Sequence, residues 1–325
     1  MDIQYLLALQ NLREALPSPV ETFFVLLSFV GDGPGLVAIA LVVYWCVDKR
    51  AGLFSFVALG SANFVSQLLK NIVCAYRPWV REPAISPPEA SLEGAGGYSF
   101  PSGHTTGTTA TFGSFAWLAR KKHRWITVVC VIFIVLMAFS RNFLSVHTPQ
   151  DVLAGLLIAL VMIALTQAFF NWLDRYDALM PQHNKDIIVM VIVLVLCALS
   201  IVVLLVKPYP LDYVNGELLV DPVAMQKGSF EAAGALAGLA IAWVLERRFI
   251  GFTTDGLDLK TRLIRGVIGV GIVGVTYLVT NVAFKAILPV NWAKLIALFC
   301  VVIMAVFVAP LVFNKLENRR SRQGE

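Results

Sequence analysis

Three short polar segments in an otherwise apolar chain contain side chains suited to phosphate chemistry. They are KNIVCAYRP at residues 70–78, PSGH at residues 101–104 and SRNFLSVHTPQD at residues 140–151. A phosphoryl group in transfer spreads negative charge over its oxygens, and fixed cations and backbone N–H groups stabilise that charge. Lys70, Arg77 and Arg141 supply cations, and each arginine offers a planar fork that matches two phosphate oxygens. These residue types predict an anion site built from three parts of the chain.

The PSGH segment adds backbone donors to this predicted site. Ser102 is a favourable N-cap for a helix that begins at Gly103, so the free N–H groups of the first turn can face an anion. Gly103 lets the backbone approach the anion closely. We expect the threonines that follow to cap the helix and to bond back to its own backbone; they are Thr105, Thr106, Thr108 and Thr109.

Two histidines take separate predicted roles. His147 and Asp151 are four residues apart, so on a helix they share a face and the carboxylate can accept the ring N–H. That contact fixes the imidazole tautomer and leaves the other nitrogen free to attack phosphorus. His104, at a different helix start, is then available to protonate the departing oxygen and later to activate water.

The composition places these segments in a membrane protein. Of 325 residues, 58% are hydrophobic and only 14% are charged, and the mean hydropathy is +0.75. Apolar runs of about 20 residues, the length that crosses roughly 30 Å of hydrocarbon as a helix, recur from end to end. The fold class is therefore all-α, a polytopic helical membrane protein. The five cysteines are scattered singly, and we predict small buried hydrophobic side chains for them.

The apolar runs predict about nine spans, with ten as the alternative. The first, at 20–47, is interrupted by the residues GDGP at 31–34, which favours one long tilted or broken helix over a tight helical hairpin. Residues 2–16 have a helical period and predict a short interfacial helix. The other spans are expected at 52–72, 103–119, 125–144, 148–171, 187–206, 229–246, 265–284 and 290–313.

The basic residues predict the orientation. They gather between or after apolar runs, at 49–50, 120–124, 247–265 and 315–322. The positive-inside rule places these loops and the C-terminus in the cytoplasm. Residues 73–102, 140–148 and 207–228 then share the extracytoplasmic side, which holds all three motifs. The net charge of +5 forms no continuous basic stripe, so we predict no nucleic-acid partner.

We divide the chain into three predicted regions. They are an interfacial helix at 1–19, a catalytic core at 20–171 and a transmembrane extension at 172–325, with the polar stretch 171–186 as the boundary. The proline-rich loop 79–98 is expected to be irregular and to cover the site. Glycines of the extension predict close helix packing; they are Gly234, Gly238, Gly266, Gly269, Gly271 and Gly274. Asp32 either lines the site or caps a helix, and Glu231 stands near an outer helix end, within reach of a ligand.

The three segments resemble the signature motifs of the type 2 phosphatidic acid phosphatase (PAP2) superfamily. The family patterns are K-x6-R-P, P-S-G-H and S-R-x5-H-x3-D, and every defining position is matched within about residues 20–171. The resemblance implies a helical core shared with vanadium haloperoxidases, a metal-independent reaction without cofactors and a phosphohistidine at His147. It further implies that His104 is the general acid, that Asp151 orients His147, and that the phosphate is held by Lys70, Arg77, Ser102, Gly103 and Arg141.

Two features depart from the family pattern. Many relatives have glycine two residues before the histidine of the third motif, where this chain has Ser145. The chain also keeps only an interfacial helix in place of one early span, and it adds the extension. That extension is loosely similar to the C-terminal halves of members that resemble sphingosine-phosphate phosphatases.

These observations predict a lipid phosphate or lipid diphosphate phosphatase that acts through a phosphohistidine at the extracytoplasmic membrane surface. A lipid phosphotransferase using the same site and a non-catalytic lipid transporter or scaffold are the alternatives. Nine spans argue against a haloperoxidase. Polyprenyl diphosphate, phosphatidate, phosphatidylglycerol phosphate and sphingoid phosphates all remain open as substrates, and so does the oligomeric state. Short loops favour a bacterial plasma membrane, with membrane lipids as the partners of the helices.

Overall fold

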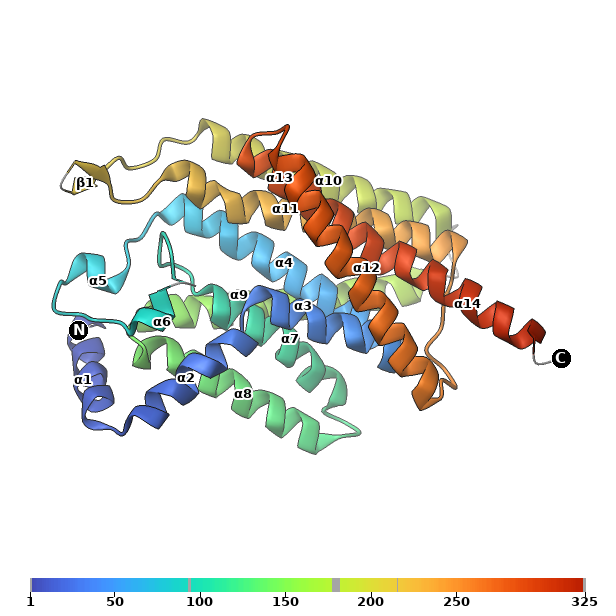
Figure 1. Ribbon diagram of the computed structural model, residues 1–325, viewed down its shortest axis with the longest axis horizontal. Coiled ribbons are helices and arrows are strands. Elements are labelled where there is room, and N and C mark those ends of the chain that lie inside the picture. Colours follow the sequence, from blue (N-terminus) through green and yellow to red (C-terminus); the bar gives the residue numbers. More distant parts are fainter. Residues whose placement is uncertain (1, 93–94, 177–181, 215, 324–325) are drawn as a thin grey trace. The chain divides into compact units, whose positions relative to one another are not determined.

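The computed structural model of the chain describes residues 2–92, 95–176, 182–214 and 216–323, and most of these lie in helices (Figure 1). The first half contains α1 (Asp2–Ala15), α2 (Ser18–Val30), α3 (Gly33–Val42), the π-helical η1 (Val43–Val47), α4 (Lys49–Val73), α5 (Pro78–Arg81), α6 (Glu89–Leu92), α7 (Gly103–Ala119) and α8 (Arg124–Phe143). The second half contains α9 (Pro149–Tyr176), α10 (Gln182–Val206), β1 (Tyr213–Val214), β2 (Glu217–Leu218), α11 (Pro222–Phe249), α12 (Leu259–Lys285), α13 (Val290–Ile303), the π-helical η2 (Met304–Val308) and α14 (Ala309–Gln323). The two short strands pair antiparallel.

The helices confirm the predicted fold class of a helical membrane protein. Among the described residues, seven helices are long and apolar enough to cross a membrane, and the pair Ser18–Val30 with Gly33–Val47 forms an eighth candidate that is bent by 58°. The remaining predicted span, at 103–119, corresponds to α7. This helix has 17 residues and so measures roughly 25 Å at 1.5 Å per residue. The expected count of about nine therefore agrees with the structure.

The break between α2 and α3 has local causes in the sequence. Asp32 is exposed, and its Oδ1 accepts a 2.9 Å hydrogen bond from the N–H of Gly33, the first residue of α3. A Cβ atom at Gly31 would lie 2.2 Å from Met137 Cε, the flexible end of that side chain, so the turn packs closely against α8. Asp32 thus contacts the first N–H of α3, and its charge also acts on the buried Arg141, so both roles considered for Asp32 have support.

The chain folds into two compact units, each built from discontinuous segments. The first contains Met1–Val37, Phe54–Gln167 and Pro208–Met225, and the second contains Ala38–Leu53, Ala168–Lys207 and Gln226–Glu325. Within the first unit, α8 packs against α7, α2 and α1. The predicted division of the sequence at residue 171 stays a prediction, because the units do not follow one cut in the chain.

In the second unit, polar groups are buried with partners. Glu246 is 2% exposed, and its Oε1 accepts hydrogen bonds from Lys49 Nζ at 2.8 Å and from the Phe252 N–H at 3.0 Å. Glu231 Oε1 lies 3.6 Å from Lys294 Nζ, so this carboxylate has a structural partner within the extension.

Close helix packing was predicted at six glycines of the extension, and the structure shows it at some of them. A Cβ atom at Gly234 would lie 2.1 Å from the Leu295 carbonyl oxygen, and one at Gly238 would lie 2.8 Å from the Phe299 carbonyl oxygen. A Cβ atom at Gly269 would lie 2.4 Å from the Trp45 ring. The prediction was wrong for Gly271 and Gly274, because no described atom lies within 4 Å of a Cβ at either position, while a Cβ at Gly266 would make ordinary contact with Cys46.

The contrast between these glycines gives a stability test. Gly234→Ala forces α11 away from the α13 backbone, which we expect to lower the free energy of unfolding by about 1–3 kcal/mol. Gly271→Ala is the matched control and should be neutral or stabilising, because alanine favours a helix over glycine by about 1 kcal/mol. Thermal unfolding of the full chain in detergent measures both, and equal midpoints for the two variants would contradict the packing.

Candidate active site

The structure brings the three predicted motifs together in the first unit. The first motif runs from the last turn of α4 to the start of α5, the second begins α7, and the third joins α8 to α9. The backbone ties these parts to one another: the Ser99 N–H donates to the Ala75 carbonyl at 2.7 Å, and the Ser102 N–H donates to the Asp151 carbonyl at 3.0 Å. Side chains from all three motifs are buried here despite their charge.

His147 lies between a guanidinium and a carboxylate. Its Nε2 atom is 2.9 Å from Arg77 Nη1, and because arginine is only a donor, Nε2 must accept through its lone pair. The proton is therefore on Nδ1, which lies 3.4 Å from Asp151 Oδ2. Burial, together with the Arg77 charge, lowers the pKa of His147, so the imidazole is neutral at pH 7. The predicted pairing of His147 with Asp151 is present, and it selects the tautomer.

Asp151 is held in place by several donors. Its Oδ2 accepts the Ser99 hydroxyl at 2.6 Å and the Thr148 N–H at 2.8 Å. The Ser99 oxygen also lies 3.3 Å from His147 Nδ1, which positions it to accept the ring proton. Ser99 was not predicted from the sequence, because no spacing links this residue to a motif almost 50 positions away.

Arg77 is fixed by backbone carbonyls from two loops. It is 4% exposed, and it donates to the Val146 carbonyl at 2.9 Å, the Gly97 carbonyl at 3.2 Å and the Gly96 carbonyl at 3.3 Å. The Trp79 ring lies 5.6 Å from the guanidinium carbon. The guanidinium is thus oriented before any anion binds.

The PSGH segment adopts the predicted capping geometry. Ser102 precedes α7, and its Oγ accepts from the Thr105 N–H at 3.4 Å and from the Thr105 hydroxyl at 3.0 Å. The Thr106 hydroxyl bonds back to the Ser102 carbonyl at 2.8 Å. No described atom lies within 4 Å of a Cβ placed on Gly103, so the backbone there is open to a close approach. The expected role of the first two threonines is confirmed, whereas the hydroxyls of Thr108 and Thr109 are buried without a hydrogen bond in the described part of the chain.

The remaining cations surround His104. The imidazole is partly buried at the start of α7, and the charges of Arg141, Lys70 and Arg77 all act on it. Arg141 is 3% exposed; its Nε donates to Ser140 Oγ at 3.0 Å, and its Nη2 donates to Ser28 Oγ of α2. All eight predicted site residues are therefore part of one neighbourhood. Among the described residues, no group of three or more His, Cys, Asp or Glu side chains is arranged to hold a metal ion.

A glycine of α9 sets the distance between the second and third motifs. A Cβ atom at Gly155 would lie 2.9 Å from the Ser102 carbonyl and 2.9 Å from Thr106 Oγ1. The helix that carries Asp151 can reach the start of α7 only because this side chain is absent.

The loop that carries His147 is strained at Ser145 and braced from α1. Ser145 has a φ of 58°, in the left-handed region that favours glycine, the residue that the family pattern leads us to expect at this position. Arg13 of α1 is 5% exposed and donates to the Phe143 carbonyl at 3.2 Å and to Ser145 Oγ at 3.4 Å. Helix α1 therefore contacts the loop of the predicted nucleophile, a link that the sequence did not reveal.

Arg13 and its helix also fasten the proline-rich loop. Arg13 Nη2 donates to the Ser86 carbonyl at 2.6 Å, and its Nε lies 3.3 Å from Glu21 Oε2. Gln10 accepts from the Ser86 N–H at 2.8 Å and donates to the Ala84 carbonyl at 3.3 Å. The described residues of the loop, 79–92 and 95–98, contain the short helices α5 and α6 and are otherwise irregular, as expected.

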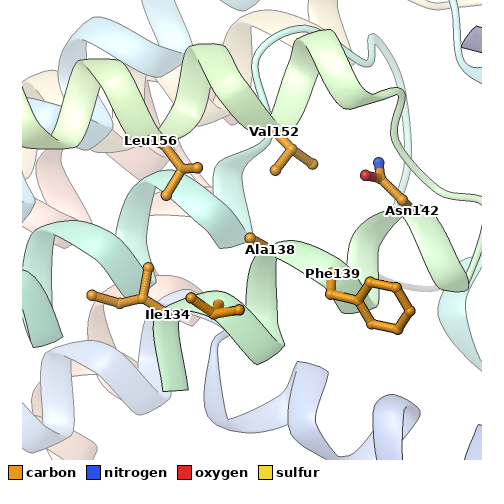
Figure 2. A pocket seen from close by; sticks show the side chains of 7 residues that line it. Ile134, Ala138, Phe139, Asn142, Val152 and Leu156 are labelled. Carbon is orange, nitrogen blue, oxygen red and sulfur yellow. The ribbon is translucent and has the colours of Figure 1, made fainter. Parts of the chain in front are cut away.

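An apolar groove begins beside the third motif, between α8 and α9 (Figure 2). It has a volume of about 300 Å³ and is lined by Ile134, Val135, Ala138, Phe139, Asn142, Val152 and Leu156. Asn142, its one polar lining residue, donates to the His147 carbonyl at 2.8 Å, and Val152 adjoins Asp151 in sequence. Val135 is 60% exposed, so the groove opens toward the surroundings of the helices.

Comparisons with known proteins identify a family and relatives for this chain. The model of the PAP2 superfamily matches residues 51–175, and the model of the PAP2 superfamily phosphatase transmembrane extension matches residues 230–321. Sphingosine-1-phosphate phosphatase 2 of Mus musculus is 29% identical over 154 residues, which are 45% of this chain and 41% of that protein. The chain therefore spans about two fifths of that relative's length.

Two bacterial relatives match the same share of the chain. Phosphatidylglycerophosphatase B of Bacillus subtilis (strain 168) is 25% identical over 150 residues, 44% of this chain and 70% of the relative. Bacitracin transport permease protein BcrC of Bacillus licheniformis is 26% identical over 140 residues, 42% of this chain and 64% of the relative. No solved structure gives a significant match.

The contacts of Arg13 give a test of the brace. Arg13→Gln removes the ion pair to Glu21 and shortens the reach to Ser145, so we expect a fall in kcat of roughly 5- to 30-fold for the loss of about 1–2 kcal/mol of hydrogen bonding. Hydrolysis of a soluble phosphate ester by the full chain measures it. Arg120→Gln, an exposed arginine whose side chain donates to the backbone of its own helix, is the control. Equal activity of the two variants would rule out the brace.

Proposed function

We propose that this chain, which belongs to the PAP2 superfamily, is a membrane-bound phosphatase that hydrolyses lipid phosphates or lipid diphosphates. The observation that carries the proposal is the position of His147. Its unprotonated Nε2 lies 2.9 Å from the guanidinium of Arg77, and its Nδ1–H faces Asp151. The proposed nucleophilic nitrogen and a proposed phosphate-binding cation thus lie in direct contact.

The proposed reaction is a double displacement at phosphorus. The phosphate oxygens bind Lys70, Arg77 and Arg141 and the N–H groups of the first turn of α7, which begins at Gly103 after Ser102. The Nε2 lone pair of His147 then forms the P–N bond as the P–O bond to the leaving group breaks. Asp151 stabilises the positive charge that develops on the ring.

His104 is the proposed acid and base of the two steps. A bound phosphate brings negative charge among the cations, which favours the protonated imidazole. His104 gives its proton to the leaving oxygen, and it later accepts a proton from the water that cleaves the P–N bond. The products are inorganic phosphate and either a lipid alcohol or a lipid monophosphate.

A membrane lipid is the proposed source of the phosphate group. The chain is an integral membrane protein, and the apolar groove between α8 and α9 reaches Asn142 beside the His147 backbone. A hydrocarbon chain in this groove leads toward the phosphate site. The basic loops support an extracytoplasmic site and a cytoplasmic C-terminus.

A transport role is the second candidate, favoured by the name of the Bacillus licheniformis relative. The intact motifs support catalysis instead, because every proposed catalytic and phosphate-binding side chain is present. Lipid movement in liposomes that persists after His147→Ala, without phosphate release, would support transport. Transfer of labelled phosphate to an added lipid alcohol distinguishes a phosphotransferase from a hydrolase.

Replacement of His147 tests the proposed nucleophile. His147→Ala removes the nitrogen that forms the covalent bond, so we expect phosphate release to fall on the order of 10³-fold or more. His123→Ala is the control, because His123 is exposed and immediately precedes α8. Near wild-type phosphate release by His147→Ala would overturn the mechanism.

Filling the groove between α8 and α9 tests whether the substrate is a lipid. Ala138→Phe fills it, and the loss of contact with about two methylene groups should raise the KM for a long-chain lipid phosphate roughly 10-fold. The rate of para-nitrophenyl phosphate hydrolysis should stay within about 2-fold of wild type, because this substrate has no hydrocarbon chain to place in the groove. Val131→Phe adds a ring to an exposed position on the same helix and is the control. An equal effect of Ala138→Phe on both substrates would mean that the groove does not bind the lipid chain.

A further inference from the structure

A segment of the extension packs against the phosphate-binding part of the core. Pro208–Met225 connects α10 to α11, yet it belongs to the first compact unit. The Tyr209 hydroxyl donates to Asn71 Oδ1 at 3.1 Å, and Asn71 Nδ2 donates to the Met225 carbonyl at 3.2 Å. Asn71 directly follows Lys70, so both ends of the segment contact the first motif.

Met225 also packs on the backbone that orients Arg77. Gly97 has a φ of 69°, and a Cβ atom there would lie 1.8 Å from Met225 Sδ. The Gly97 carbonyl accepts the Arg77 Nε–H at 3.2 Å. Glycine at this position therefore gives the segment a close fit around the stretch of backbone that holds the guanidinium.

The same segment places a carboxylate on Tyr76, the residue that precedes Arg77. The Tyr76 hydroxyl donates to Asp212 Oδ2, and the Tyr76 ring lies 5.9 Å from the ring of the buried Tyr98. Asp212 is exposed, and Tyr76 immediately precedes Arg77. An exposed carboxylate thus lies one residue away from Arg77 along the first motif, in addition to the buried Asp151 of the site.

We propose that residues 208–214 and 216–225 form one wall of the phosphatase site and that Asp212 determines substrate specificity. The proposal rests on the proposed phosphatase function. The second oxygen of the Asp212 carboxylate can accept an ammonium or hydroxyl group of the substrate, and its charge repels an additional phosphate. The favoured class is a phosphate monoester whose alcohol carries an ammonium or hydroxyl group near the ester oxygen, and diphosphates are disfavoured.

Substrate competition in the full-length protein tests this specificity. Asp212→Asn removes the charge but keeps the acceptor for Tyr76. We expect kcat/KM to fall roughly 3- to 10-fold with a long-chain amino-alcohol phosphate, because a charge attraction is lost, and to rise by a similar factor with a polyprenyl diphosphate, because a repulsion is lost. Phosphatidate and para-nitrophenyl phosphate, which lack an ammonium group, should change less than about 2-fold on the same grounds.

Two further variants make the result specific to this contact. Glu217→Gln removes the same charge from β2 of the same segment and should leave all four substrates unchanged. Tyr76→Phe removes the hydroxyl that positions the Asp212 carboxylate. It should therefore weaken the discrimination between amino-alcohol phosphate and diphosphate, in the same direction as Asp212→Asn. A uniform change across the four substrates, or no change, would overturn the specificity role. Failure of the wild-type protein to hydrolyse para-nitrophenyl phosphate would instead contradict the proposed phosphatase function.

Discussion

The arrangement of the site depends on the environment of one imidazole. His147 has a guanidinium at Nε2 and a carboxylate at Nδ1, and both partners are buried. Because an unpaired buried charge is costly, Arg77 and Asp151 need further partners, which the backbone of residues 96–102 and 146–148 supplies. The surrounding helices serve to bring these loops together and to exclude water from them.

The helices bring the loops of the site together because their backbones approach one another closely. Gly155 lets α9 meet the start of α7, and the Ser102 N–H then bonds to the Asp151 carbonyl. Ser145 accepts a left-handed conformation in the loop before His147, where Arg13 contacts its hydroxyl. The conformational cost of a side chain at this position is thus offset by a contact from α1.

Much of this could be predicted from the sequence, for identifiable reasons. Long apolar runs give helices of known minimum length, and the four-residue spacing of His147 and Asp151 places them on one face. The alternation of spans predicted that residues 207–228 lie on the same side as the three motifs. In the structure, Tyr209 of the first unit donates a hydrogen bond to Asn71 of the first motif. Contacts between residues distant in sequence, such as those of Arg13, Ser99 and Met225, leave no periodic signal. Glycine spacing likewise did not distinguish Gly234, which faces Leu295, from Gly271, which faces no neighbour among the described residues.

The stereochemical course at phosphorus tests the central claim most directly, because it reports how many in-line displacements occur. The full-length protein would hydrolyse a phosphate ester made chiral with oxygen isotopes and sulfur, in isotopically labelled water. Attack by His147 followed by attack of water inverts the phosphorus twice, so a covalent role for His147 predicts net retention of configuration. Net inversion would mean that water attacks the ester directly, and it would contradict that role.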